Sequence, residues 1–248
     1  MNLRNLAGMS LVAAGCLAGL PAMANTVSGS TTVAGTANIF AAGQSSPAVV
    51  GSDGSLPPFI SLAAGANAIS FSSITGTVRL GTAGANPAYG PDGLDYASAF
   101  YIGAPTIPVS DLKSNRNGPT LWGVFLNDSV PTGPHPASLD FSNAGLGIAF
   151  TSASPALRQS FFIGDGLTGT GSGAQQTFLV PTGATRLFLG VLDGLAVNAA
   201  PGNAYFNNTG AFVVGYELTV PAAPVPEPEA GLLMLAGLGL VGLKLRRS

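Results

Sequence analysis

Apolar and polar residues alternate in several segments of the chain, most regularly near its C-terminal end. Between Phe212 and Val220 every second residue is large and apolar, and most of the residues between them are small or polar. A period of two is typical of a β-strand with one buried face. Shorter apolar runs predict further strands at 69–80, 121–126, 161–163, 178–180 and 187–192.

Turn-forming residues separate these segments. Residues 25–57 are rich in Ser, Thr, Ala and Gly, with only short apolar stretches, and no segment of ten residues or more between 25 and 221 has the 3.6-residue period of a helix. Many short strands joined by turns predict an all-β domain, a sandwich or jelly roll, over residues 25–222. Gly, Pro, Asn and Asp, which favour tight turns, cluster at 89–93, 115–119, 164–166 and 181–183.

The N-terminal segment has the three parts of a secretory signal. Arg4 supplies a positive charge, residues 6–20 are apolar, and Ala22 and Ala24 form an A-x-A cleavage site. We therefore expect an N-terminal signal helix in residues 1–24 that is removed after Ala24. One alternative is a lipoprotein signal that ends at Cys16, although the residue three positions before Cys16 is Ala, where Leu is usual.

The C-terminal segment, residues 223–248, is also tripartite. A Pro-Glu-Pro motif at 226–228 is followed by an apolar run at 230–243 and then by a basic end. We expect the apolar run to form a short transmembrane helix with the basic end on the cytoplasmic side. The prolines favour an extended chain before that helix, which suits a protease groove. The alternative is an ordinary membrane anchor with a Pro-rich linker. The motif residues are Val225, Pro226, Glu227 and Pro228, and the basic end contains Lys244, Arg246 and Arg247.

This order of Pro-Glu-Pro, short apolar helix and terminal arginines resembles the PEP-CTERM sorting signal. The resemblance implies an exosortase, a membrane-embedded cysteine protease, as processing partner in a Gram-negative bacterium that makes exopolysaccharide. It also implies that the inner membrane holds the chain only transiently, through the C-terminal helix. We therefore expect a protein of the cell envelope, outer surface or extracellular matrix.

Charge and cysteine content narrow the function further. Residues 25–224 contain nine acidic and five basic side chains, a net charge of −4, with no basic patch. Nucleic acid is therefore not an expected partner. The only cysteine is Cys16, so the mature domain has no disulfide, and its stability must come from core burial, helped in one interpretation by a metal ion.

A polar group lies between the last two predicted strands. Asp193 ends one strand, and Asn207 and Asn208 precede the next. If those strands are neighbours, one carboxylate and two amide oxygens converge, which is an oxygen set that Ca²⁺ accepts. The other interpretation is that these Asn residues, with the Gly that follows, only form a turn.

Three stretches, 161–166, 176–190 and 207–212, resemble the calcium-dependent galactophilic lectins of bacteria, and the likeness extends weakly back to residue 37. The resemblance implies a galactose-binding-like jelly roll in which Ca²⁺ binds sugar hydroxyls. By position, Asp193, Asn207 and Asn208 would be side-chain ligands, and Ala204 and Leu80 would give carbonyls. Two departures are the longer loop 195–203 and the residues 94–98, which lack the His and Gln of the lectins. Galactose specificity therefore does not carry over.

Other residues with catalytic or binding potential lack partners in the sequence. Ser110 and Lys113 match an S-x-x-K pattern without the accompanying motifs. His135, the only histidine, lies in a Pro-flanked loop that we expect to be exposed, and one His without Cys builds neither a zinc site nor a catalytic dyad. Trp122 lies inside an apolar run and is expected in the core.

We therefore expect a non-catalytic, exported protein of the envelope or matrix whose sandwich binds polysaccharide through Ca²⁺. The alternative is a structural envelope or biofilm protein that acts by self-association without a ligand. An exopolysaccharide hydrolase is a third interpretation, for which the sequence shows no acid/base pair.

Overall fold

The computed structural model describes residues 24–81, 86–104, 106–193 and 204–222. Within these ranges every regular element is a β-strand, except for two short 3₁₀ helices, η1 (Ile39–Ala41) and η2 (Pro47–Val50). The predicted all-β class is therefore confirmed. None of the helices in these ranges is long and apolar enough to cross a membrane. The predicted signal helix with Ala22, the Pro-Glu-Pro motif, the terminal arginines and the C-terminal helix lie outside the described residues.

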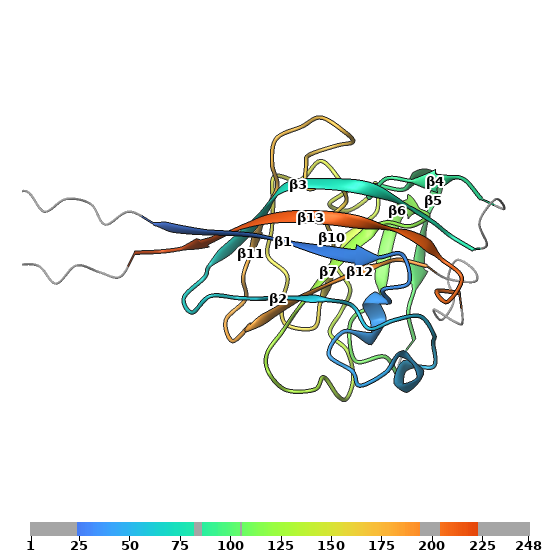
Figure 1. Cartoon of the computed structure of the whole chain (residues 1–248), viewed down its shortest axis with the longest axis horizontal. Coiled ribbons are helices and arrows are strands. Elements are labelled where there is room, and N and C mark those ends of the chain that lie inside the picture. Colours follow the sequence, from blue (N-terminus) through green and yellow to red (C-terminus); the bar gives the residue numbers. More distant parts are fainter. Residues whose placement is uncertain (1–23, 82–85, 105, 194–203, 223–248) are drawn as a thin grey trace, which may run out of the picture. The chain divides into compact units, whose positions relative to one another are not determined.

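Residues Ala24–Pro221 form one compact unit that contains three sheets. In Figure 1, β3, β13 and β1 lie side by side in the largest sheet. The strands of the first sheet are β1 (Asn25–Ala34), β13 (Thr209–Val220), β3 (Ala68–Arg79), β11 (Thr177–Leu179) and β9 (Ser152–Ala153), in that order, with β4 (Ala88–Tyr89) paired to β3. The second contains β10 (Ser160–Phe162), β7 (Leu121–Leu126), β12 (Arg186–Val191) and β2 (Phe59–Ser61). The third contains β5 (Leu94–Ile102), β6 (Leu112–Asn117) and β8 (Asp140–Phe141).

The centre of the first sheet is the antiparallel pair of β3 and β13. Their register shifts between Gly215 and Glu217, because β3 contains one residue more than β13 at this point. The extra residue is a β-bulge. It allows Ile69 before the bulge and Val78 after it to be buried on the same core side, although their spacing in the sequence is odd. The apolar alternation of 69–80 is thus confirmed with one interruption.

Aromatic side chains fill the core of the unit. Every residue of β7 is buried, which explains its unbroken apolar run, since a strand covered on both faces has no polar side. Trp122 is fully buried and donates its indole N–H to Oγ1 of Thr120 at 2.8 Å. Its ring meets Phe141 and Phe162 edge-on. The interior position expected for Trp122 is confirmed.

The structure also contains strands that the apolar pattern did not predict. β1 lies in the Ser/Thr-rich segment and pairs with β13 along its whole length. β5 and β6 are interrupted by polar residues and by a register shift between Asp95 and Phe100. Backbone pairing, rather than alternation of apolar side chains, places these segments in sheets. The β-sandwich is confirmed, and the finer jelly-roll assignment stays a prediction.

Candidate functional site

Asn208, at the residue before β13, bridges three segments that are far apart in the sequence. Its Nδ2 donates hydrogen bonds to Oδ2 of Asp193 at 2.9 Å and to the carbonyl of Gly35 at 3.0 Å. Its Oδ1 accepts a hydrogen bond of 2.9 Å from the N–H of Gly81. Asp193 and Asn208 are each only 6 % exposed. Both side chains are therefore part of the protein interior.

Tyr205 is a further member of this hydrogen-bonded cluster. Its hydroxyl oxygen accepts a hydrogen bond of 3.1 Å from the N–H of Asp193, and its own N–H donates to Oδ1 of Asp53 at 2.8 Å. Burial raises the pKa of the Tyr205 phenol well above its ordinary value, and the negative charges of Asp193 and Asp53 act in the same direction. Tyr205 therefore remains a neutral hydrogen-bonding group at physiological pH.

Asn207 differs from its neighbour. Its Oδ1 is buried and has no hydrogen-bond partner among the residues that the structure describes. A buried polar oxygen without a partner costs on the order of 1–3 kcal/mol, and such atoms in native proteins are few. A water molecule or a cation at this oxygen would remove that cost. The Asn207 oxygen, one residue before the Asn208 bridge, is thus a candidate ligand atom.

The predicted convergence of Asp193 and Asn208 occurs, but by a different route from the one that we expected. Asp193 follows β12 and Asn208 directly precedes β13, and these two strands belong to different sheets. The assumption that the two strands are neighbours in one sheet is therefore wrong. The two residues meet instead where the ends of two stacked sheets come together. Of the predicted backbone ligands, the carbonyl of Leu80 accepts a hydrogen bond of 2.9 Å from Asn86, and Ala204 is half-buried at the start of the turn that leads to Tyr205.

The donors fit a calcium ion in part. Asp193 has a carboxylate that accepts a hydrogen bond from Asn208, and Asn207 has an amide oxygen without a partner among the described residues, whereas the oxygen of Asn208 accepts from Gly81. No group of three His, Cys, Asp or Glu side chains within the described ranges could hold a metal ion. A cation here would therefore be held largely by amide and carbonyl oxygens, which Ca²⁺ accepts.

The sequence did not identify Gly35, Asp53, Gly81 or Tyr205 as members of this cluster. Gly35, Asp53 and Gly81 lie more than a hundred residues before Asn208 in the sequence, and only the packing of sheet ends brings them together. Asp53 lies in a Gly/Ser/Pro-rich segment whose composition predicts only a loop. The sole local signal was Tyr205, an aromatic residue between the Gly/Ala/Asn-rich loop and the turn.

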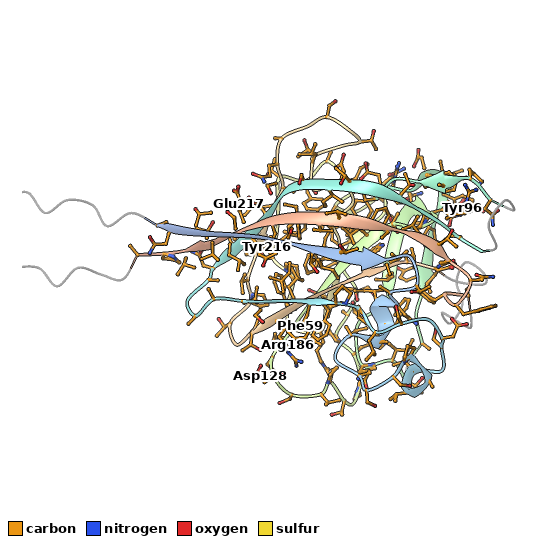
Figure 2. All side chains as sticks on the ribbon, in the orientation of Figure 1. Phe59, Tyr96, Asp128, Arg186, Tyr216 and Glu217 are labelled. Carbon is orange, nitrogen blue, oxygen red and sulfur yellow. The ribbon has the colours of Figure 1, made fainter. Side chains whose placement is uncertain are left out.

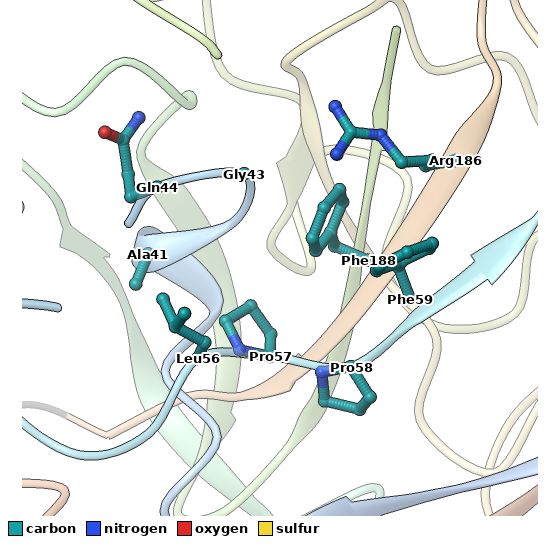
Figure 3. Close-up of a pocket in the computed structure, with 9 residues that line it drawn as sticks. All are labelled: Ala41, Gly43, Gln44, Leu56, Pro57, Pro58, Phe59, Arg186 and Phe188. Carbon is teal, nitrogen blue, oxygen red and sulfur yellow. The ribbon is translucent and has the colours of Figure 1, made fainter. Parts of the chain in front are cut away.

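A separate surface pocket of about 500 Å³ lies beside β2 and β12. Figure 3 shows Arg186 next to the rings of Phe59 and Phe188, with the guanidinium carbon 5.7 and 5.1 Å from the two ring centroids. Arg186 also donates two hydrogen bonds to the carbonyl of Asn127. The guanidinium of Arg186 in this pocket is thus already held by contacts within the protein.

The residues whose catalytic potential the sequence did not support, Ser110, Lys113 and His135, make structural contacts. Ser110 is buried and accepts a hydrogen bond of 2.8 Å from the N–H of Ser160, whereas Lys113 forms an ion pair with Asp140. The Pro-flanked loop is exposed at 132–134, as expected, but His135 itself is half-buried. Its side chain is 20 % exposed and its Nε2 lies 3.6 Å from Oδ1 of Asp111, because the Pro-flanked loop folds back onto the residues before β6.

Comparisons with known proteins identify the tail. Residues 224–248 match the PEP-CTERM protein-sorting motif. No curated protein and no solved structure matches the chain, so the resemblance to the galactophilic lectins stays a prediction. The motif indicates an exported, envelope-directed protein that is processed by exosortase.

Proposed function

We propose that this exosortase-sorted protein carries a non-catalytic β-sandwich that binds Ca²⁺ at the Asp193–Asn208 end and, through the ion, a polysaccharide of the extracellular matrix. The proposal places the sandwich outside the inner membrane, on the surface or in the matrix of a Gram-negative bacterium. The sorting motif supports export to the envelope, and the hydrogen-bonded cluster around Asn208 supports the proposed position of the binding site.

The unpartnered Oδ1 of Asn207 is the observation that carries this proposal. The neighbouring cluster already holds a buried carboxylate, Asp193, within 2.9 Å of the Asn208 amide. Asn207 directly precedes Asn208 in the chain, and a buried carboxylate together with an uncompensated amide oxygen at the same end of β13 would favour a cation. With a single carboxylate ligand the affinity would be modest, which suits the millimolar Ca²⁺ of extracellular sites.

The polysaccharide would bind where the site reaches the surface. Ca²⁺ accepts six to eight oxygen ligands, more than Asp193, Asn207 and nearby carbonyls provide. Vicinal sugar hydroxyls can occupy the remaining positions in place of water. The residues themselves would hold the ion and exclude water on the inner side, and they would perform no chemistry on the sugar.

Calorimetric titration of the exported chain with CaCl₂ tests the metal site. We expect heat of binding and a rise in Tm, both lost in Asn207→Ala. The matched control is Asn67→Ala, which removes an exposed Asn side chain from the turn between β2 and β3. Absence of heat and of a Tm rise in the unmodified chain would reject calcium.

A glycan array in the presence of Ca²⁺ and of EDTA tests the sugar. We expect binding that EDTA abolishes. A chain that binds Ca²⁺ but no glycan would reject the polysaccharide and favour the structural alternative, in which the sandwich contacts other matrix proteins. Release of reducing sugar from exopolysaccharide would contradict the non-catalytic assignment.

A further inference from the structure

The edges of the three sheets differ in how they are protected against pairing with another chain. Edge strands in soluble proteins are usually short, charged, bulged or flanked by Pro. β8 and β9 have two residues each, and β10 and β2 have three, with Pro57 and Pro58 directly before β2. β5 is long, but it carries Asp95 and a register break. Each of these edges is therefore poorly suited to pairing.

β1 has none of these protections. It is ten residues long, it contains no charged residue and no Pro, and its pairing with β13 is regular from Asn25 to Ala34. Among the described residues no strand pairs with its other edge. Its outer backbone N–H and C=O groups therefore form a continuous row that can pair with an additional strand.

The first part of β1 is also uncovered on both faces. Asn25 to Ser28 are all exposed, whereas Val33 is fully buried. The second layer of the sandwich thus covers the later part of β1 and leaves the first part open on either side. Figure 2 shows Tyr216 and Glu217 on the neighbouring strand β13, and Tyr216 pairs with Gly29 where the uncovered part ends. An added strand would meet no described layer along Asn25–Ser28.

Val27 is the large apolar side chain of this open part. It is 45 % exposed, although it points to the same face as the buried Val33 and its pairing partner Leu218 is only 1 % exposed. An exposed valine in the middle of an uncharged, open edge segment gives two paired strands an apolar contact in addition to their backbone hydrogen bonds. The surrounding residues are small and hydroxylated, so they pair across strands without repulsion.

We propose that β1 pairs antiparallel with β1 of a second copy of this chain, about a two-fold axis at Val27. A two-fold axis normal to a sheet keeps the core faces of both copies on the same side. It therefore sets Val27 against Val27, Thr26 against Ser28, and Asn25 against Gly29. Two half-exposed valines bury each other, and Thr and Ser hydroxyls face each other on the opposite side. The first sheets of two copies become one continuous sheet.

The second copy is the partner that the segment fits best, because both strands of the pair are then uncharged and the only large apolar side chain meets its own equivalent. A strand of another protein would have to supply a matching valine by coincidence. The pairing does not involve Asp193, Asn207 or Asn208, so it is independent of calcium and of sugar.

Disulfide trapping in the full chain tests the register, with Cys16→Ser so that the introduced cysteine is the only one. Directly opposite Cα atoms are about 4.5–5.5 Å apart in antiparallel pairs, which lies within the range for a disulfide. Under mild oxidation Val27→Cys should form a covalent dimer, and EDTA should not change the yield. Thr26→Cys alone should not form a covalent dimer, because its partner is Ser28, but a mixture of Thr26→Cys and Ser28→Cys should form one.

Sedimentation of the full chain in mild detergent tests the association itself. Val27→Lys should abolish the dimer, because two lysines would then face each other. The matched control is Val213→Lys, since Val213 is 48 % exposed on the central strand β13 and has no free edge. Equal cross-linking of Val27→Cys and Thr26→Cys, a monomer at all concentrations, or a dimer that Val27→Lys leaves intact would each overturn the proposal.

Discussion

The N–H of Asp165 donates a hydrogen bond of 2.9 Å to Oδ1 of Asp92, which places two carboxylates side by side in turns that are far apart in the sequence. Burial raises the pKa of the Asp92 carboxyl to about 6, and repulsion from Asp165 adds to the rise. The hydrogen bond from Asp165 and the charge of Arg116 oppose it. Arg116 also donates from Nε to the carbonyl of Asp92 at 2.9 Å.

This pair predicts a pH dependence of stability. In the unfolded chain Asp92 titrates near its ordinary pKa of 3.8, and in the folded chain near about 6. The folded state therefore binds more protons between these values, and its stability should fall as the pH rises from about 4 to about 6. Thermal unfolding from pH 4 to 7 should show a falling Tm, and Asp92→Asn should flatten the profile.

The exposed Asp128 gives the control for that experiment, because its side chain is 84 % exposed. Asp128→Asn should leave the fall in Tm unchanged. A profile that Asp92→Asn does not flatten would mean that other groups cause the fall.

Asn208→Asp separates a structural from a metal-binding role of this side chain. A carboxylate at 208 would face Asp193 and the carbonyl of Gly35 in place of the donating Nδ2. Each lost bond at a buried polar group costs on the order of 1–3 kcal/mol, so Tm without Ca²⁺ should fall by several degrees. With Ca²⁺ the variant should recover more Tm than the unmodified chain gains, because it has a second carboxylate. A low Tm that Ca²⁺ does not raise would contradict the calcium site.

Two glycines distinguish backbone strain from lack of space. Gly76 has φ +95° in β3, and a Cβ there would overlap the carbonyl oxygen of Ala211. Gly51 has φ +67° with nothing within 4 Å of a Cβ. Gly51→Ala should cost only the strain of a positive φ, about 1–2 kcal/mol. Gly76→Ala should cost that strain plus about 1–3 kcal/mol of overpacking. Equal losses in urea unfolding would show that space at Gly76 does not matter.

The buried bond between Thr120 and Trp122 can be measured by a double-mutant cycle. Thr120→Val keeps the volume but leaves the indole N–H without its acceptor, and should cost about 1–3 kcal/mol in urea unfolding. In a Trp122→Phe background the same change should cost much less, because the donor is gone. An equal cost in both backgrounds would assign the loss to Thr120 alone. Thr77→Val, at an exposed site on β3, gives the baseline.

The sorting motif predicts how the chain is processed. Replacement of Pro226 and Pro228 by Ala should prevent removal of the tail, because the segment would no longer be fixed in the extended form that suits the protease. Mass spectrometry and fractionation should then find the full C-terminal segment in the membrane fraction. The control is Pro221→Ala, which lies before the matched residues 224–248. Normal processing of the double variant would show that the prolines are not read.

Sequence reasoning was most successful where one local property determines the outcome. The period of two predicted β13 and the unbroken apolar run predicted β7, because the exposure of each strand face is written directly into the order of side chains. The sorting motif was recognised for the same reason, since its parts are contiguous. The sequence did not predict β1, because Ser and Thr give no apolar period and because the place of β1 in the sheet depends on its pairing with β13.

For the candidate site, the sequence by itself determined that Asp193, Asn207 and Asn208 carry oxygen donors close to strand ends. Only the tertiary structure decided that the Asn208 amide bonds to Gly35, Gly81 and Asp193, and that two sheets rather than one bring Asp193 and Asn208 together. It also decided that Asn207 has a buried oxygen without a partner among the described residues. The physical reason is that hydrogen-bond partners and burial depend on how distant segments pack. No local pattern in the chain encodes that packing.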